Sequence, residues 1–157
     1  MSRPVPQRFR DAFRGLARVA ASQPNLRIHA FMGFTAFGAA WIEQRPPWTD
    51  AVVALAVGLV IGLEAMNSAV ESLVNLAHPA WDEAAGRIKD MAAAAVLVAS
   101  LGALAAGVVM FGPGLSRLPQ DLSRAWTHDR AALVLWCTGF AVEFVLAFVV
   151  PSPRSER

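Results

Sequence analysis

Four polar side chains follow one another at helical spacing directly after a wholly apolar run. The run covers residues 51–63, and the polar residues that follow are Glu64, Asn67, Glu71 and Asn75. Gaps of three, four and four residues place all four on one stripe of a helix. An ionisable group in hydrocarbon costs about 2.5–3.5 kcal/mol or more. The stripe therefore indicates either a site where water, a metal ion or a polar ligand meets a membrane, or a helix that leaves the bilayer at Glu64 and wets its polar face.

The residue types on this stripe, with two that follow it, permit phosphoryl transfer. Glu64 comes first and lies deepest, where a carboxylate suits a general base. Glu71 lies nearer to water and is better placed to hold Mg²⁺, which prefers one or two carboxylates plus substrate phosphates. Asn67 can hydrogen-bond to either acid. Lys89, the only lysine of the chain, precedes Asp90 at the start of the next apolar segment, where its charge could neutralise phosphate oxygens. The chain has no GxxxxGK[ST] loop and no protein-kinase motif set.

The composition is that of a membrane protein. Of the 157 residues, 55% are hydrophobic and 17% are charged, whereas soluble domains carry about 25% charged residues. The formal net charge of +2 is too small to indicate nucleic acid as a partner. A single cysteine, Cys137, excludes an intrachain disulfide. We therefore predict a small polytopic membrane protein with an all-α fold.

The elements that must position the polar stripe follow from the apolar pattern. Residues 8–22 read as an amphipathic helix lying on a membrane surface, because an apolar stripe runs beside an arginine stripe. Four membrane spans are expected at 26–42, 48–75, 91–111 and 131–150, with a connection at 113–130 that contains a short interfacial helix near 118–126. The first span is short, so its entry arginine, Arg27, is expected to snorkel to the interface, and His29 is interpreted as an interfacial polar residue.

The distribution of basic residues predicts the topology. With four spans, the N-terminus, the 76–90 connection and the C-terminal tail share one side of the membrane. Ten lysines and arginines fall on that side, counting Arg27, and four on the other. The richer side is expected to be cytoplasmic. The polar stripe then emerges at the cytoplasmic face of the inner membrane, where a nucleotide can reach it.

Several separated segments resemble the prokaryotic diacylglycerol kinase family. The segment EAMNSAVESLVN (64–75), a connection without gaps, and KDMAAAAVLV (89–98) are similar in order and spacing to the pattern of that family. FRDAFRGL (9–16) and NLRIH (25–29) resemble its N-terminal surface helix and first span, closest to the undecaprenol-kinase branch. The resemblance covers roughly residues 9–111, so residues 1–112 are expected to form a lipid-kinase-like membrane domain.

The resemblance implies a lipid kinase. It implies a homotrimer with active sites shared between subunits, Mg²⁺ with ATP as the phosphoryl donor, and a membrane lipid alcohol, diacylglycerol or undecaprenol, as the acceptor. By motif, Glu64 corresponds to the catalytic base and Glu71 to the carboxylate that holds the metal on the ATP phosphates. Asn67, Lys89 and Asp90 correspond to polar residues of the catalytic and nucleotide sites.

Some positions depart from the pattern of the family. Gln23 replaces a second metal-binding glutamate, so it can offer Mg²⁺ an amide oxygen but no charge. Asn75 replaces an aspartate, and Trp81 retains the aromatic residue of the connection, expected near the nucleotide. The 131–150 span, which carries Glu143 in its middle, lies beyond the usual three spans. A non-enzymatic membrane protein, serving as an ion pathway or scaffold, and a catalytically weak kinase relative therefore stay open as alternatives.

Overall fold

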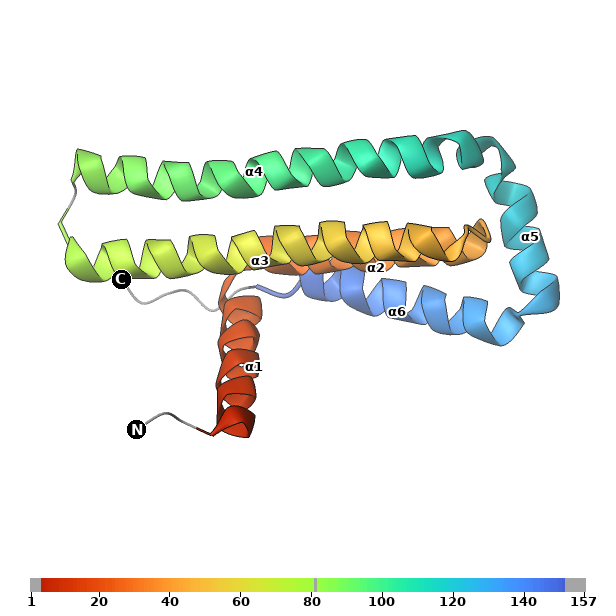
Figure 1. Ribbon diagram of the computed structural model, residues 1–157. Coiled ribbons are helices and arrows are strands. Elements are labelled where there is room, and N and C mark those ends of the chain that lie inside the picture. The colour runs from red at the N-terminus through yellow and green to blue at the C-terminus, as the bar shows by residue number, and fades with distance from the viewer. Residues whose placement is uncertain (1–3, 81, 152–157) are drawn as a thin grey trace.

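The computed structural model describes residues 4–80 and 82–151, and every regular element within these ranges is helical. The elements are α1 (Val5–Ser22), α2 (Pro24–Ile42), α3 (Pro47–Ala77), α4 (Glu83–Phe111), the 3₁₀ helix η1 (Gly112–Arg117), α5 (Leu118–His128) and α6 (Arg130–Phe148). Four long helices, α2, α3, α4 and α6, run side by side, whereas α5 lies across one end of the bundle and α1 crosses it at the start of α2, partway along α3 and α4 (Figure 1).

Three stretches of the described chain are long and apolar enough to cross a membrane. They are Pro47–Ala77, Glu83–His128, whose apolar part is α4, and Arg130–Phe148. Many large apolar side chains on them face outward, such as Leu55, which is 75% exposed. Outward apolar surface of this extent fits a lipid surrounding. The predicted all-α membrane fold is confirmed.

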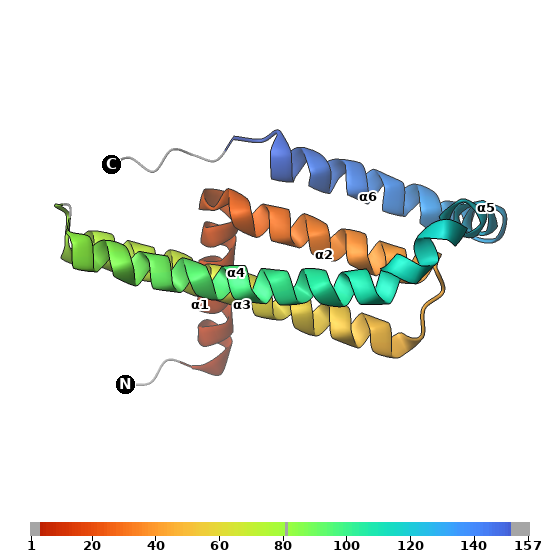
Figure 2. The same ribbon diagram turned by 90° about the horizontal axis from the view of Figure 1, so that it is seen from above.

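Helix α2, the first predicted span, is not among these stretches. Its entry carries Asn25, Arg27 and His29, which lower its mean hydropathy. The crossing of the membrane by α2, and with it the total of four spans, therefore stays a prediction. Its packing supports that prediction, because α2 lies between α3 and α6 along most of its length (Figure 2).

Arg27 does not simply snorkel to an interface. Its Nη1 donates hydrogen bonds to the carbonyl oxygens of Leu146 at 3.1 Å and Val150 at 3.0 Å. Leu146 lies in the last turn of α6 and Val150 just beyond its end, where helix carbonyls lack intrahelical donors and the helix dipole favours a positive charge. An arginine of α2 therefore caps α6 and joins the two helices at this end of the bundle.

Helix α3 is long enough to carry the polar stripe out of the hydrocarbon. Its 31 residues correspond to about 46 Å, whereas the hydrocarbon core of a bilayer is about 30 Å thick. Glu64 lies about 26 Å from Pro47 along the axis, close to the edge of such a core. Glu71 and Asn75 then lie beyond that edge, in the interfacial region.

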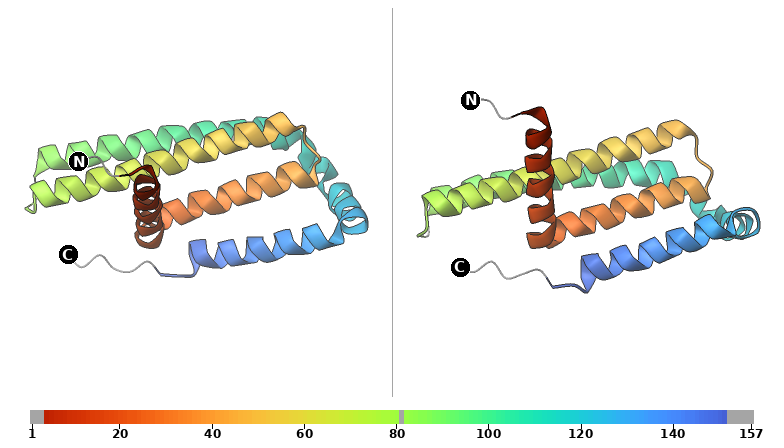
Figure 3. Two further views of the ribbon diagram at one scale, coloured as in Figure 1. Left: turned by 60° about the horizontal axis from the view of Figure 1, so that its bottom comes forward. Right: turned by 90° about the horizontal axis from the view of Figure 1, so that it is seen from below.

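Helix α1 lies at a steep angle to the bundle, as both views in Figure 3 show. It begins at Val5 rather than at the predicted Arg8, because a proline in the first turn lacks only an N–H that has no helical partner there. None of its described residues is buried, and Phe9 and Phe13 are exposed on its apolar stripe. This arrangement suits a helix whose apolar face enters a membrane surface.

Helix α4 begins at Glu83, within the 76–90 connection and before residue 91, where the span was predicted to start. Asp82 is its N-cap, and the Asp82 Oδ1 atom accepts a hydrogen bond from the backbone N–H of Ala85 at 2.9 Å. That hydrogen bond lowers the pKa of Asp82 below its usual value, because it stabilises the carboxylate. The cap sets where α4 starts, and with it the position of Lys89 and Asp90.

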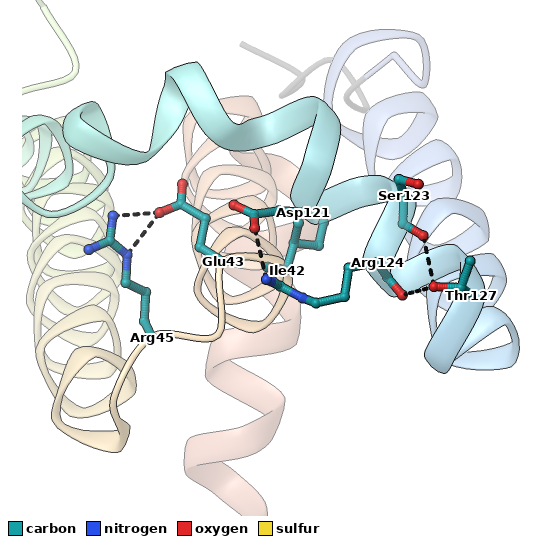
Figure 4. Close-up of polar contacts among 7 residues, drawn as sticks. All are labelled: Ile42, Glu43, Arg45, Asp121, Ser123, Arg124 and Thr127. Carbon is teal, nitrogen blue, oxygen red and sulfur yellow. Dashed lines mark hydrogen bonds and ion pairs between the residues drawn. The ribbon is translucent and has the colours of Figure 1, made fainter.

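Helix α5 is held across the far end of the bundle by Arg124 (Figure 4). Arg124 donates to the Ile42 carbonyl oxygen at 2.8 Å and pairs with Asp121 at 3.0 Å. Arg45 donates from Nε to Glu43 at 2.8 Å, and the side chain of Glu43 is only 5% exposed. The Arg124 bond to Ile42 fixes the end of α2 against α5, whereas the Arg45–Glu43 pair lies within the turn between α2 and α3.

Candidate active site

Three of the predicted site residues, Glu64, Asn67 and Glu71, follow one another along one face of α3. Glu64 is 2% exposed and Asn67 is 8% exposed, so both are buried. The Asn67 Nδ2 group donates a hydrogen bond to Glu71 Oε1 at 3.2 Å. This bond uses one oxygen of the Glu71 carboxylate and leaves the other, Oε2, able to ligate a cation. The stripe thus runs from a buried acid through an amide to a half-buried acid.

Glu64 and Asn67 line a pocket of about 340 Å³ between α2, α3 and α4. Helix α2 contributes Asn25, Ile28 and His29, and α4 contributes Ala93, Val96, Leu97 and Ser100. The pocket is therefore mostly apolar, with a few polar groups near the acid. Such a combination suits a ligand with a small polar head and an apolar body.

Lys89 joins the outer part of the stripe. Its Nζ donates a hydrogen bond to Asn75 Oδ1 at 2.5 Å, which ties the start of α4 to the last turns of α3. Asn75 is the position where the resemblance gives an aspartate. An asparagine holds Lys89 without neutralising its charge, so the full positive charge remains for an anionic ligand.

Two of the predicted site residues, Asp90 and Gln23, are not brought into these contacts. Asp90 is exposed on α4 and does not line the pocket. Gln23 is half-buried at the junction of α1 and α2, also outside the pocket lining. Trp81 lies outside the described residues.

A metal ion would need ligands from its substrate at this site. Within 4–80 and 82–151, no three His, Cys, Asp or Glu side chains come together to hold an ion. Mg²⁺ fits that donor set, because it is bound in kinases by one or two carboxylates with the remaining positions taken by phosphates and water. Glu71 can supply such a carboxylate.

Sequence reasoning missed the contributions of α2 and α4 to the pocket. His29 was interpreted as an interfacial residue and Ser100 received no role, yet both line the pocket with Glu64. The signal on α2 was present: Asn25, Ile28 and His29 follow the i, i+3, i+4 spacing of one helix face. Which face of α2 meets α3 could not be read from that spacing alone.

The family model for prokaryotic diacylglycerol kinase matches residues 10–111. The chain belongs to the prokaryotic diacylglycerol kinase family. The match covers most of α1 and the whole of α2, α3 and α4, so every residue that lines the pocket lies within it, whereas α5 and α6 lie outside it.

A relative described as a diacylglycerol kinase, from Synechocystis sp. (strain ATCC 27184 / PCC 6803 / Kazusa), is 39% identical over 111 residues. The alignment covers 70% of this chain and 63% of the relative, so the chain spans less than two thirds of that protein. No solved structure matches the chain. The family assignment therefore comes from sequence, and the geometry of the pocket comes from the fold described above.

Proposed function

We propose that this protein is a lipid kinase that transfers the γ-phosphoryl group of ATP to the hydroxyl of a membrane lipid alcohol, diacylglycerol or undecaprenol. The observation that carries the proposal is the buried carboxylate of Glu64 in a largely apolar pocket. Membership of the prokaryotic diacylglycerol kinase family supports the same reaction.

The positions of the side chains support the following course of the reaction. The lipid hydroxyl enters the pocket and gives its proton to Glu64, its oxygen attacks the γ-phosphorus, and ADP leaves with the electron pair of the broken bond. Asn67 orients the carboxylate of Glu71 through their hydrogen bond. Most of the catalysis would be positioning and electrostatic stabilisation, as in other phosphoryl transfers.

The nucleotide would lie at the outer end of the stripe. Lys89 offers a positive charge to the phosphates, and Asp90, which is exposed one residue further along α4, is proposed as a nucleotide-site and catalytic residue from its motif alone. Glu71, with Gln23 and Trp81 as further candidates from the resemblance, would hold Mg²⁺ and the nucleotide. Bound Mg²⁺ would neutralise charge on the transferred phosphoryl group.

The asymmetry of basic residues supports a cytoplasmic position of this end of the bundle in the inner membrane. A homotrimer, implied by the resemblance, is also part of the proposal. The exposed apolar faces of the long helices leave room for contacts between subunits.

The test is phosphate transfer by the purified full chain in detergent micelles. Labelled ATP and Mg²⁺ are offered with diacylglycerol and with undecaprenol, and labelled lipid is measured. The proposal predicts transfer to at least one lipid. A folded protein that labels neither lipid would favour an ion pathway or scaffold, or a relative without turnover.

A further inference from the structure

The Ser100 hydroxyl on α4 lacks the intrahelical hydrogen bond that most hydroxyls of the long helices make, as does that of Thr49 in the first turn of α3, which lies outside the pocket. In an apolar helix, a serine or threonine usually donates to the carbonyl oxygen four residues earlier. Four described residues do so: Thr35 to Phe31, Ser68 to Glu64, Ser72 to Ser68 and Thr138 to Val134, at 2.8–3.0 Å. Ser100 Oγ is buried, and among residues 4–80 and 82–151 it has no hydrogen-bond partner.

A second buried polar atom in the same pocket also has no partner in the described chain. Asn67 is 8% exposed, and its Oδ1 is unpaired while its Nδ2 donates to Glu71. Asn67 and Ser100 both line the pocket with Glu64. A buried polar atom without a partner costs about 1–3 kcal/mol. Two such atoms in one pocket point to a ligand that completes their hydrogen bonds.

The direction of the helices places Ser100 at the inner end of the pocket. Helix α4 runs inward from Lys89, so Ser100 lies about 10 Å deeper than Ala93 along the axis. Helix α3 runs the opposite way, so Glu64 lies deeper than Asn67. Glu64 and Ser100 line the same pocket, so a ligand whose hydroxyl meets Glu64 can offer a second oxygen to Ser100.

We propose that Ser100 is a specificity-determining residue that donates a hydrogen bond to an ester carbonyl of the lipid acceptor. This inference rests on the proposed function. A hydroxyl group can donate to an ester carbonyl but gains little from an ether oxygen, and a polyprenol has no oxygen beyond its reacting hydroxyl. The pocket therefore favours an acceptor with an acyl ester next to its hydroxyl.

The experiment compares matched acceptors with the full chain in detergent micelles. The acceptors are a 1,2-diacylglycerol, the 1,2-dialkylglycerol of equal chain length, which has ether linkages, and a polyprenol. We expect the wild-type protein to favour the ester over the ether about 5- to 10-fold in kcat/KM, as one neutral hydrogen bond allows. Ser100→Ala is expected to remove this preference by lowering kcat/KM for the ester alone, with KM for ATP unchanged.

Two variants control for structural effects. Ser100→Thr keeps the donor and is expected to retain the preference. Thr138→Val removes a hydroxyl that is already bonded to Val134 on α6, outside the pocket. This variant is expected to leave kcat/KM unchanged for both the ester and the ether acceptor. Because the Ser100 hydroxyl is unpaired without ligand, Ser100→Ala is expected to leave the melting temperature unchanged or raised.

The outcomes separate the inference from the function on which it rests. If the wild-type protein phosphorylates lipids but Ser100→Ala lowers ester and ether equally, or lowers neither, Ser100 does not read the ester and the inference is overturned. If the wild-type protein prefers the polyprenol, the inference is overturned and the kinase stands. If the wild-type protein phosphorylates none of the three lipids, the proposed function fails and the inference fails with it.

Discussion

The two faces of α2 are built in opposite ways. The face toward α6 is filled: the Phe34 and Trp136 rings stack with centroids 6.2 Å apart, and Phe31 packs on Phe140 at 5.0 Å. The face toward α4 is hollow and carries polar groups around the 340 Å³ pocket. Tight packing holds a helix in place, whereas a hollow with unpaired polar atoms needs a ligand. The face of α2 toward α6 therefore holds the helix in place, whereas the face toward α4 is the one that can bind a ligand.

The family match divides the molecule along the same line. It includes every pocket residue and stops at residue 111, before α5 and α6. Helix α6, which lies outside the matched region, packs on α2 and is capped by Arg27, which lies within that region. We infer that α6 supports the kinase-like core from outside the site.

The largest effect is expected from removing the buried acid on the hollow face. Glu64→Gln keeps the shape of the side chain but removes the base, so kcat is expected to fall by about 10²- to 10⁴-fold. Labelled-phosphate transfer measures this loss, and the melting temperature checks the fold.

The matched control variant changes an acid on α6, the helix that packs against the filled face of α2. Glu143 lies half-buried on α6, outside the pocket, and Glu143→Gln is expected to leave kcat within about twofold. Equal losses in the two variants would contradict the division between the faces.

The next effect concerns the metal. Glu71→Gln removes the carboxylate proposed to hold Mg²⁺ and is expected to raise the Mg²⁺ concentration for half-maximal activity about tenfold, which corresponds to about 1.4 kcal/mol. Gln23→Glu adds the charge that the family pattern has at that position and is expected to lower the same concentration. Titration of activity with Mg²⁺ measures both. An unchanged titration in Gln23→Glu would place Gln23 outside the metal site.

A stability effect is expected on the filled face. A Cβ atom added at Gly38 would overlap the indole of Trp136, so Gly38→Ala is expected to destabilise the protein by about 1–3 kcal/mol. Gly58→Ala on α3 meets no atom within 4 Å and is expected to be neutral or stabilising by up to about 1 kcal/mol. Thermal unfolding in detergent compares the pair. A Gly38→Ala protein as stable as Gly58→Ala would mean that α6 does not pack as described.

The smallest effect is a pH dependence at the N-cap of α4. The folded pKa of Asp82 is lowered by its bond from the Ala85 N–H, so its contribution to stability is present above the unfolded pKa of about 3.9 and is lost as the pH falls through the lower folded pKa. Asp82→Asn keeps a capping oxygen and is expected to weaken this acid dependence. The melting temperature between neutral and acid pH measures it, and an identical pH profile in the variant would rule out the cap as its source.

The sequence predicted the features that hydrophobic periodicity controls, which are where helices lie along the chain and which residues share a helix face. The stripe from Glu64 to Asn75 lies on one helix, and helices are found at the predicted residues 8–22 and 118–126, the first starting three residues earlier. Spacing alone could not predict the partners across helices. The cap that Arg27 makes on α6, the fit of Gly38 around Trp136 and the entry of His29 and Ser100 into the pocket depend on helix rotation. A helix pattern shows which residues share a face but not which neighbour that face meets.

The central claim, that the acceptor occupies the hollow face, can be tested with a photoreactive lipid. A diacylglycerol that carries a diazirine near its ester groups is crosslinked to the Glu64→Gln protein without ATP, so that the bound lipid is not converted, and the labelled peptides are sequenced. The account predicts label at pocket residues such as Ile28 and Leu97, with excess unlabelled diacylglycerol preventing it. Label that is spread over the outer faces of α4 and α6 and is not displaced by unlabelled lipid would contradict the account.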